Sequence, residues 1–187
     1  RAWHYSEYAN IWRITDDFWD NWASLKDMFT RCERWQDHVK KGCYPDCDML
    51  PLGFLGRGFG QERQTNFTKD EQRTMLTLWC MFGSPLMLGC ELTKLDDDTL
   101  ALITDGKILG LHSEGRHGRQ LVHNDRISVW INEPVNDKAV DKTSYIALFN
   151  LEDEKKTVKV DLSQYEVDSD KVLEYEIPAH GSVMVEL

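Results

Sequence analysis

Two stretches in the first half of the chain carry apolar residues at the three- and four-residue spacing of a helix. In residues 19–37 these positions are Trp19, Trp22, Leu25, Met28, Phe29, Cys32 and Trp35. The second stretch begins with Thr68 and Glu71 at the spacing of a capping box, and its apolar positions are Met75, Leu78, Trp79 and Phe82. The spacing predicts one helix over 19–37 and another that starts after Thr68.

Three other segments of this half show different patterns. Residues 84–92, "SPLMLGCEL", are a compact apolar run bounded by proline and glycine, which predicts a buried strand. Residues 96–112 predict one or two short helices, because acidic residues stand where a first helical turn favours them. Residues 42–66 hold two prolines, five glycines and no periodicity, so they predict a long irregular segment. A loop of this length usually carries functional residues.

The pattern changes near residue 115 to short alternating runs that are separated by turn residues, such as "SVWIN", "YIALFNL" and "TVKVDLS". We therefore expect an α/β fold followed by an all-β region. Residues 1–114 would form the α/β part. Their few strand and helix units cannot close a (β/α)8 barrel, which needs roughly 200–250 residues. Residues 115–187 would form a small antiparallel β-sandwich.

Composition narrows the classes of partner. The chain has 187 residues, 22 of them basic and 32 acidic, for a formal charge of −10. This balance argues against a nucleic-acid partner, which needs a clustered basic face. No run approaches the roughly 20 apolar residues of a membrane span, so no membrane partner is expected.

Five cysteines leave at least one thiol without a partner in the chain. We expect buried, reduced thiols in a cytoplasmic protein; a secreted protein whose signal lies upstream is the alternative. Cys43 and Cys47 have no second cysteine or histidine pair nearby, so we expect no metal and no cofactor.

The chemistry-bearing residues gather in "IWRITDDFWDNW". If residues 11–13 form a strand, Asp16 and Asp17 follow its carboxyl end, where barrel enzymes place catalytic side chains. Arg13 and three tryptophans surround them, as in a sugar pocket. Alternatively, Asp16, Asp17 and Asp20 are the cap and first-turn acids of the helix that follows.

A second acidic pair lies in "YPDCDML". Asp46 and Asp48 are two residues apart, so on an extended segment they point the same way. They would hold the hydroxyls of a sugar or a metal ion; a solvated turn is the alternative.

Taken together, four stretches resemble the family-27 glycoside hydrolases, the α-galactosidase (melibiase) family, over roughly residues 5–150. They are "YANIWRITDDFWDNW", "CYPDCDMLPLG", "RQTNFTKDEQRTMLTLWCMFGSPLMLGCEL" and "LALITDGKILGLH", in the order and spacing of the family. The resemblance implies a (β/α)8 barrel, of which this chain would hold about strands six to eight with their helices. A β-sandwich follows that barrel.

The resemblance also implies roles for individual residues. The W-R-x-x-x-D motif places the general acid/base at Asp17 and a galactose-binding guanidinium at Arg13. The W-N-D-P-D-M-L motif, here "YPDCDML" from Tyr44, implies that Asp48 bonds sugar hydroxyls and that Met49 packs beneath the ring. Such retaining enzymes use two carboxyl groups about 5–5.5 Å apart.

The nucleophile of the family lies in a Lys-x-Asp motif on the fourth strand, and no such string precedes residue 11. We therefore expect this chain to be the C-terminal part of a retaining enzyme that hydrolyses α-galactosides. By itself, the chain is expected to be inactive. Its partners would be an α-galactoside and either the N-terminal barrel half in trans or a second copy of the chain. The alternative is a non-catalytic galactoside-binding or interaction module.

Overall fold

The computed structural model describes residues 2–187. Its helices are α1 (Ala2–Tyr8), α2 (Trp22–Trp35), α3 (Lys69–Phe82), α4 (Asp97–Ile103) and α5 (Gly106–Gly110). Its strands are β1 (Ile11–Arg13), β2 (Tyr44–Asp46), β3 (Phe54–Leu55), β4 (Arg63–Gln64), β5 (Arg116–His123), β6 (Ile127–Pro134), β7 (Tyr145–Asn150), β8 (Lys156–Asp161), β9 (Val172–Ile177) and β10 (Ser182–Glu186). Short 3₁₀ turns occupy Gln36–His38, Arg57–Phe59, Leu92–Lys94 and Leu162–Gln164.

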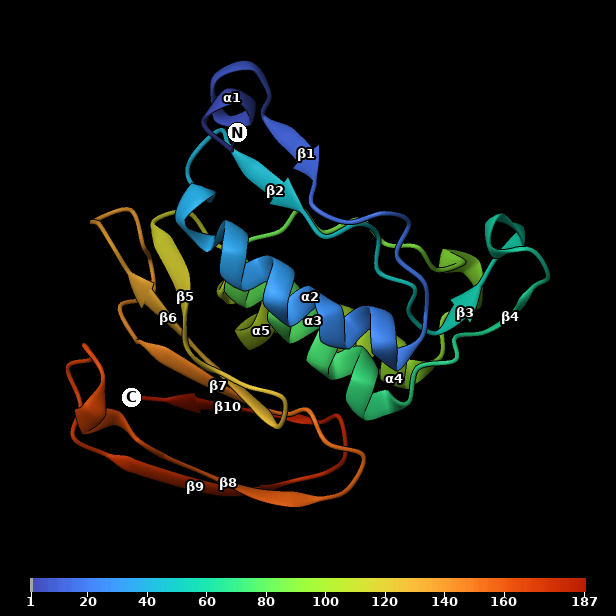
Figure 1. Cartoon of the computed structure of the whole chain (residues 1–187). Helices are drawn as coiled ribbons and strands as arrows, with labels where there is room; N and C mark the ends of the chain where they lie inside the picture. Colours follow the sequence, from blue (N-terminus) through green and yellow to red (C-terminus); the bar gives the residue numbers. More distant parts are fainter. Residues whose placement is uncertain (1) are drawn as a thin grey trace.

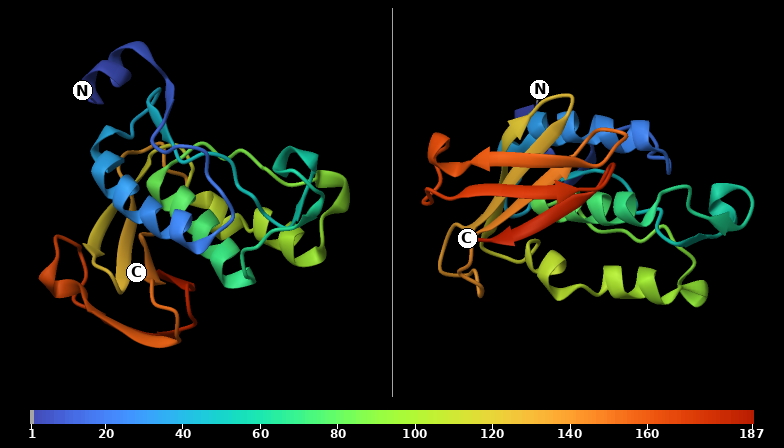
Figure 2. Two further views of the ribbon diagram at one scale, coloured as in Figure 1. Left: turned by 45° about the vertical axis from the view of Figure 1, so that its right-hand side comes forward. Right: turned by 90° about the horizontal axis from the view of Figure 1, so that it is seen from below.

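An antiparallel sheet with the strand order β10-β7-β6-β5 forms the centre of the molecule. Helices α2 and α3 lie side by side over one face of this sheet, and the β8–β9 pair lies over the other face (Figure 1). A second view places α4 and α5 beside α3, away from β8 and β9 (Figure 2). The protein is thus a mixed helix and sheet fold in three layers.

The alternation of side chains along β6 and β7 explains why both faces of the sheet are covered. Trp130, Ala147 and Phe149 pack against the helices, whereas Val129 and Ile146 pack against β8 and β9. Successive residues of a strand point to opposite faces, and here both sets are apolar. The continuous hydrophobic runs in this region therefore correspond to strands that are buried on both sides.

Helix α3 begins and ends as the sequence predicts. Thr68 caps it in a complete capping box with Glu71, and Gly83 ends it in the left-handed conformation. At its carboxyl end the helix comes very close to β5: a Cβ at Gly118 would overlap the Met81 carbonyl oxygen. Glycine at position 118 is what allows this close approach of helix and sheet.

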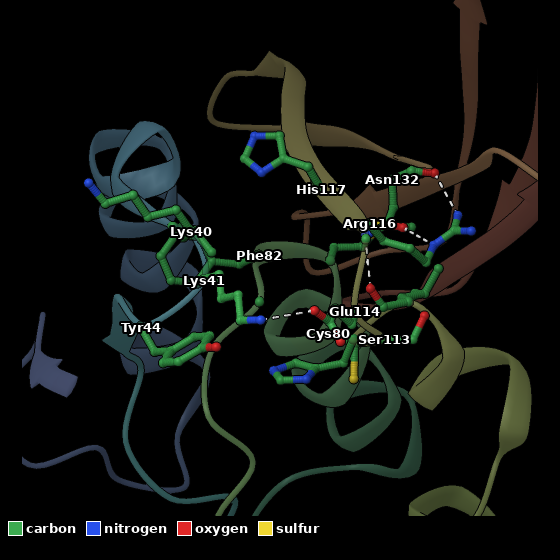
Figure 3. A pocket seen from close by; sticks show the side chains of 17 residues that line it. Lys40, Lys41, Tyr44, Cys80, Phe82, Ser113, Glu114, Arg116, His117 and Asn132 are labelled. Carbon is green, nitrogen blue, oxygen red and sulfur yellow. Dashed lines mark hydrogen bonds and ion pairs between the residues drawn. The ribbon is translucent and has the colours of Figure 1, made fainter. Parts of the chain in front are cut away.

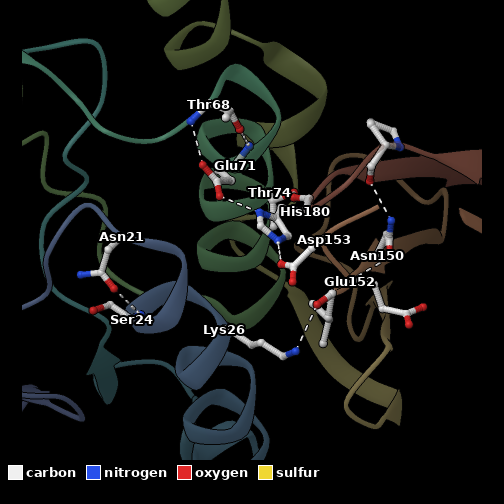
Figure 4. Close-up of polar contacts among 12 residues, drawn as sticks. Asn21, Ser24, Lys26, Thr68, Glu71, Thr74, Asn150, Glu152, Asp153 and His180 are labelled. Carbon is white, nitrogen blue, oxygen red and sulfur yellow. Dashed lines mark hydrogen bonds and ion pairs between the residues drawn. The ribbon is translucent and has the colours of Figure 1, made fainter. Parts of the chain in front are cut away.

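A second set of contacts joins the helices to the sheet at the other end of α3 (Figure 4). The His180 ring stacks on Trp22, with ring centroids 3.8 Å apart. Its Nδ1 lies 2.7 Å from Glu71 Oε1, and its Nε2 lies 2.8 Å from Asp153 Oδ1. One histidine therefore links α2, α3 and the turn after β7.

Strands β1 and β2 form a separate, parallel two-stranded sheet. Residues 84–92, predicted as a buried strand, form none, and Met87 and Leu88 are 44% and 43% exposed. The backbone of this segment pairs with Leu50 through a single parallel bridge, and Pro85 has no amide to donate. The prediction of a strand is wrong, although the segment does run parallel to the chain after β2.

Candidate functional site

The acidic cluster lies in the segment that follows β1, as the sequence predicts. The α2 helix begins only at Trp22, and its cap is Asn21, whose side chain accepts the Ser24 amide at 2.9 Å. Asp16 and Asp17 therefore lie outside the helix and are exposed, with the Asp17 side chain 83% accessible. The alternative interpretation of these acids as helix caps is wrong.

Asp48 is held in one conformation by three hydrogen bonds. Its Oδ2 accepts the Phe18 amide at 2.8 Å, and its own amide donates to Asp46 Oδ1 at 2.8 Å. Its carbonyl oxygen accepts the Trp79 indole N–H at 2.9 Å. The backbone φ of Asp48 is +77°, a left-handed value that an L-residue adopts at a cost in free energy. Strain maintained by surrounding contacts in this way is typical of functional positions.

Arg13 brings the two acidic segments together. Its guanidinium nitrogen Nη2 lies 2.7 Å from Asp48 Oδ2 and 3.7 Å from Asp17 Oδ1, and it donates to the Asp16 carbonyl at 2.6 Å. The Arg13 side chain stays partly exposed, and Asp48 is buried. The structure thus places Arg13, Asp17 and Asp48 in one cluster at the carboxyl ends of two parallel strands.

Asp46 lies behind this cluster and is almost fully buried. Burial raises the pKa of its carboxyl group above the ordinary value, although the Asp48 amide and the Arg13 charge act in the opposite direction. The proximity of the Asp48 carboxylate raises this pKa further. The cluster therefore contains carboxyl groups in three different environments, from the buried Asp46 to the exposed Asp17.

Asp20 belongs to a neighbouring ion pair that the sequence did not reveal. Arg63 donates to both of its oxygens, at 2.5 Å and 2.8 Å, and the Asn66 amide donates at 2.7 Å. Burial alone would raise the pKa of Asp20, but these hydrogen bonds and the Arg63 charge hold it below its ordinary value. The pair fixes the segment after β1 to β4, far away in sequence.

The three tryptophans of this stretch do not form one aromatic wall. Trp12 is buried next to Tyr5 and Trp35, and Trp22 stacks on His180. Trp19 is 49% exposed. Met49 is also partly exposed and lies against Gly89, where a Cβ would come within 3.1 Å of the Met49 sulfur. The structure thus leaves Trp19 and Met49 available to a ligand near the cluster.

A cavity of about 440 Å³ lies elsewhere, between the carboxyl end of α3, the turn before β5 and the start of β2 (Figure 3). Tyr44 lines it, together with Lys41, His112 and Arg116. Tyr44 opens β2 whereas Asp46 ends it, so this cavity and the acidic cluster lie at opposite ends of the strand. The Tyr44 side chain therefore belongs to a different part of the surface from Asp48.

Among residues 2–187, no group of three or more His, Cys, Asp or Glu side chains has the geometry to hold a metal ion. Within the same range, no helix is long and apolar enough to cross a membrane.

Comparison with known proteins shows first which class of enzyme has a similar fold and then to which protein family the chain belongs. The crystal structure of a GH27 β-L-arabinopyranosidase from Geobacillus stearothermophilus matches this structure with a TM-score of 0.89 and 37% identity, over 99% of this chain and 46% of that one. The fold thus matches nearly half of a glycoside hydrolase structure. The family model described as Alpha galactosidase A matches residues 3–114, and the chain belongs to this melibiase family.

Curated relatives agree with this assignment. Alpha-galactosidase 2 of Arabidopsis thaliana is 27% identical over 136 residues, which are 72% of this chain and 32% of that protein. Human alpha-galactosidase A is 28% identical over 130 residues, which are 66% of this chain and 28% of that protein. The chain thus spans about a third of the length of these relatives.

Proposed function

We propose that the chain is the C-terminal part of a retaining α-galactosidase-like glycoside hydrolase. One observation carries the proposal: Arg13 holds Asp17 and Asp48 together at the carboxyl ends of β1 and β2. This is the edge at which barrel enzymes assemble their active sites. The cluster also lies inside the segment that the family model matches.

In this proposal, β1, β2 and the segment parallel to Leu50 correspond to strands six to eight of a (β/α)8 barrel, within residues 1–114. The parallel pairing of these segments supports the correspondence. Residues 115–187, whose strands stack in two antiparallel layers, would be the C-terminal β-sandwich.

The side chains have the properties that these roles require. Asp17 is the general acid/base, because its exposed carboxyl group can reach a glycosidic oxygen in an open pocket. Arg13 and Asp48 bind the hydroxyls of the sugar, and Asp48 Oδ1 accepts no hydrogen bond from residues 2–187. Met49 packs beneath the ring with its exposed thioether.

The second carboxylate of the pair would come from another polypeptide. We propose that it is supplied by a polypeptide equivalent to the part of the relatives that this chain does not span, or by a second copy. The exposed Ile11 on β1 and the exposed Met87 and Leu88 beside β2 support such an association, because both edges of the parallel strands carry apolar side chains.

The sugar that is released from the substrate is proposed to be α-D-galactopyranose. The Geobacillus stearothermophilus relative favours a second candidate, β-L-arabinopyranose. That relative, at 37% identity, is described as a β-L-arabinopyranosidase. β-L-Arabinopyranose has the ring configuration of α-D-galactopyranose and lacks only the hydroxymethyl group at C5. Contacts of Arg13 and Asp48 with ring hydroxyls would therefore suit both sugars.

The non-catalytic alternative is a galactoside-binding or interaction module. It would keep Arg13, Asp48 and Met49 for the sugar and never acquire a nucleophile. It differs from the first proposal in one experimental outcome. The binding module would bind galactose but would not hydrolyse a galactoside, even when it is mixed with the N-terminal half of a related enzyme.

A reducing, cytoplasmic location is also proposed. All five cysteines are unpaired thiols within the described range, and four of them are buried. Cell fractionation of the native host would decide between this location and a secreted one.

Reconstitution tests the proposal. The chain is co-expressed with the N-terminal half of the Geobacillus stearothermophilus enzyme, and hydrolysis of 4-nitrophenyl α-D-galactopyranoside and β-L-arabinopyranoside is measured. We expect activity in the mixture, its loss in Asp17→Asn, and its retention in the matched control Asp16→Asn. Equal activity of the two variants would contradict the role of Asp17. Galactose binding with no turnover in any mixture would favour the binding module.

A further inference from the structure

Residues 17 to 20 alternate between exposed and buried side chains. Phe18 and Asp20 are 3% exposed, whereas Asp17 and Trp19 point to solvent. The two exposed side chains flank the buried Phe18, and Asp20 turns inward directly after Trp19. Asp17 and Trp19 therefore both lie on the solvent-facing side of this segment.

The inward-pointing residues hold this face in place. The Phe18 amide is bonded to the Asp48 carboxylate, and Asp20 is bonded to Arg63 through both oxygens. The position of Trp19 relative to Asp17 is thus fixed from both sides, by contacts that do not involve the Trp19 ring itself.

A second aromatic ring completes this surface. The Phe59 ring lies 6.2 Å from the Trp19 ring at an interplanar angle of 85°, an edge-to-face pair. Phe59 belongs to the loop between β3 and β4, and β4 carries Arg63. The ion pair between Arg63 and Asp20 therefore brings the two aromatic residues together from segments about forty positions apart in the sequence.

We propose that Trp19 and Phe59 form the binding surface for the leaving group of the substrate, and that it selects leaving groups with a flat apolar face. This inference rests on the proposed function, since it uses Asp17 as the general acid. An aryl ring or the apolar face of a second pyranose is the chemistry that fits an exposed indole.

The geometry of general acid catalysis places the leaving group there. As the bond between the anomeric carbon and the glycosidic oxygen breaks, its electron pair stays with the oxygen, which takes the proton of Asp17 and departs as an alcohol. The second carboxylate of the pair forms the new bond to the anomeric carbon. The departing group must therefore lie beside Asp17, on the face that Trp19 shares.

The test compares leaving groups in the reconstituted enzyme. We expect Trp19→Ala to lower kcat/KM for 4-nitrophenyl α-D-galactopyranoside about tenfold, through KM more than through kcat. The same variant leaves hydrolysis of α-D-galactosyl fluoride unchanged, because fluoride offers no apolar face and needs little protonation. Trp19→Phe restores most of the loss, and Phe59→Ala gives a smaller loss of the same kind. Trp3→Ala is the matched control, because Trp3 is 66% exposed on α1, before the amino end of β1.

An equal loss for both substrates, or no loss for either, would overturn the proposed surface. If the reconstituted wild-type enzyme hydrolyses nothing, the proposed function fails, and direct binding then decides the inference. The indole N–H resonance of Trp19 in the chain is followed by NMR while 4-nitrophenyl or methyl α-D-galactopyranoside is added. A shift caused by the aryl compound alone supports the surface, and no shift with either compound contradicts it.

Discussion

Two regions of this molecule hold their side chains in place by different means. In the helix–sheet body, which comprises α2, α3 and the sheet of β5, β6, β7 and β10, large side chains such as Trp130 and Phe149 are completely buried. At the site edge, which comprises β1, β2 and segments 14–21 and 47–50, the fixed groups are held by Arg13, Arg63 and backbone amides. Burial therefore stabilises the body, and directed polar contacts position the chemistry.

The largest expected effect concerns the body. Trp130→Ala removes a fully buried indole between α3 and the sheet, so we expect the free energy of unfolding to fall by about 4 kcal/mol. Urea denaturation followed by circular dichroism measures this loss. Trp3→Ala, at a mostly exposed tryptophan, should stay within about 0.5 kcal/mol. Losses of similar size in the two variants would mean that burial of a tryptophan side chain does not determine how much it stabilises the fold.

The next effect concerns the polar contacts of the site edge. Arg63→Ala leaves the buried Asp20 carboxylate without its cation, and we expect a loss of about 3 kcal/mol by the same measurement. Arg57→Ala is the matched control, since Arg57 is 88% exposed and makes only a 3.6 Å pair with Glu62. If Arg63→Ala lowered the free energy of unfolding as little as Arg57→Ala does, the ion pair would not hold β4 against the segment after β1.

The same carboxylate predicts a dependence on pH. The pKa of Asp20 is lower in the folded chain than its ordinary value near 3.8, so the unfolded state takes up its proton first as the pH falls. The stability that Asp20 contributes is complete above the unfolded pKa and is lost as the pH falls through the folded pKa. In urea denaturation between pH 7 and pH 2, the advantage of the wild-type chain over Asp20→Asn should shrink below about pH 4. An advantage independent of pH would contradict this assignment.

His180 allows a comparison at the junction of helices and sheet. His180→Asn removes the ring that stacks on Trp22 and bonds to Glu71, and asparagine tolerates the left-handed φ of +57° at this position. We expect a loss of about 2 kcal/mol from the missing stacking and hydrogen bonds. Asp153→Asn, at a side chain that is 93% exposed, should cost much less. The reverse order would indicate that the exposed carboxylate, and not the ring, holds the junction.

The two regions also differ in how far the sequence predicts them. Helix α3 follows from a local capping box and periodic apolar residues, and the strands after residue 115 follow from short β-rich runs that are separated by turn residues. The pairing of Asp20 with Arg63, and of Glu71 with His180, joins residues that are distant in the sequence, and no local pattern contains such information. The predicted strand at 84–92 fails for a related reason, because an apolar run becomes a strand only where neighbouring strands pair with it. At the candidate site, the motifs named Arg13, Asp17 and Asp48, which the structure brings into one cluster. The positions of Trp12 and Trp22 depend on packing against residues distant in the sequence, which no motif contains.

The smallest expected effect on stability falls on the residue that matters most for the proposed chemistry. The Asp17 side chain is 83% exposed, and its contact with Arg13, at 3.7 Å, is long. Asp17→Asn should therefore change the free energy of unfolding by less than about 0.5 kcal/mol. Asp48→Asn, in contrast, weakens the Arg13 contact at a buried, strained position and should destabilise the chain measurably. A strongly destabilised Asp17→Asn would mean that Asp17 supports the fold. In that case, loss of hydrolysis in the variant would no longer identify it as the acid.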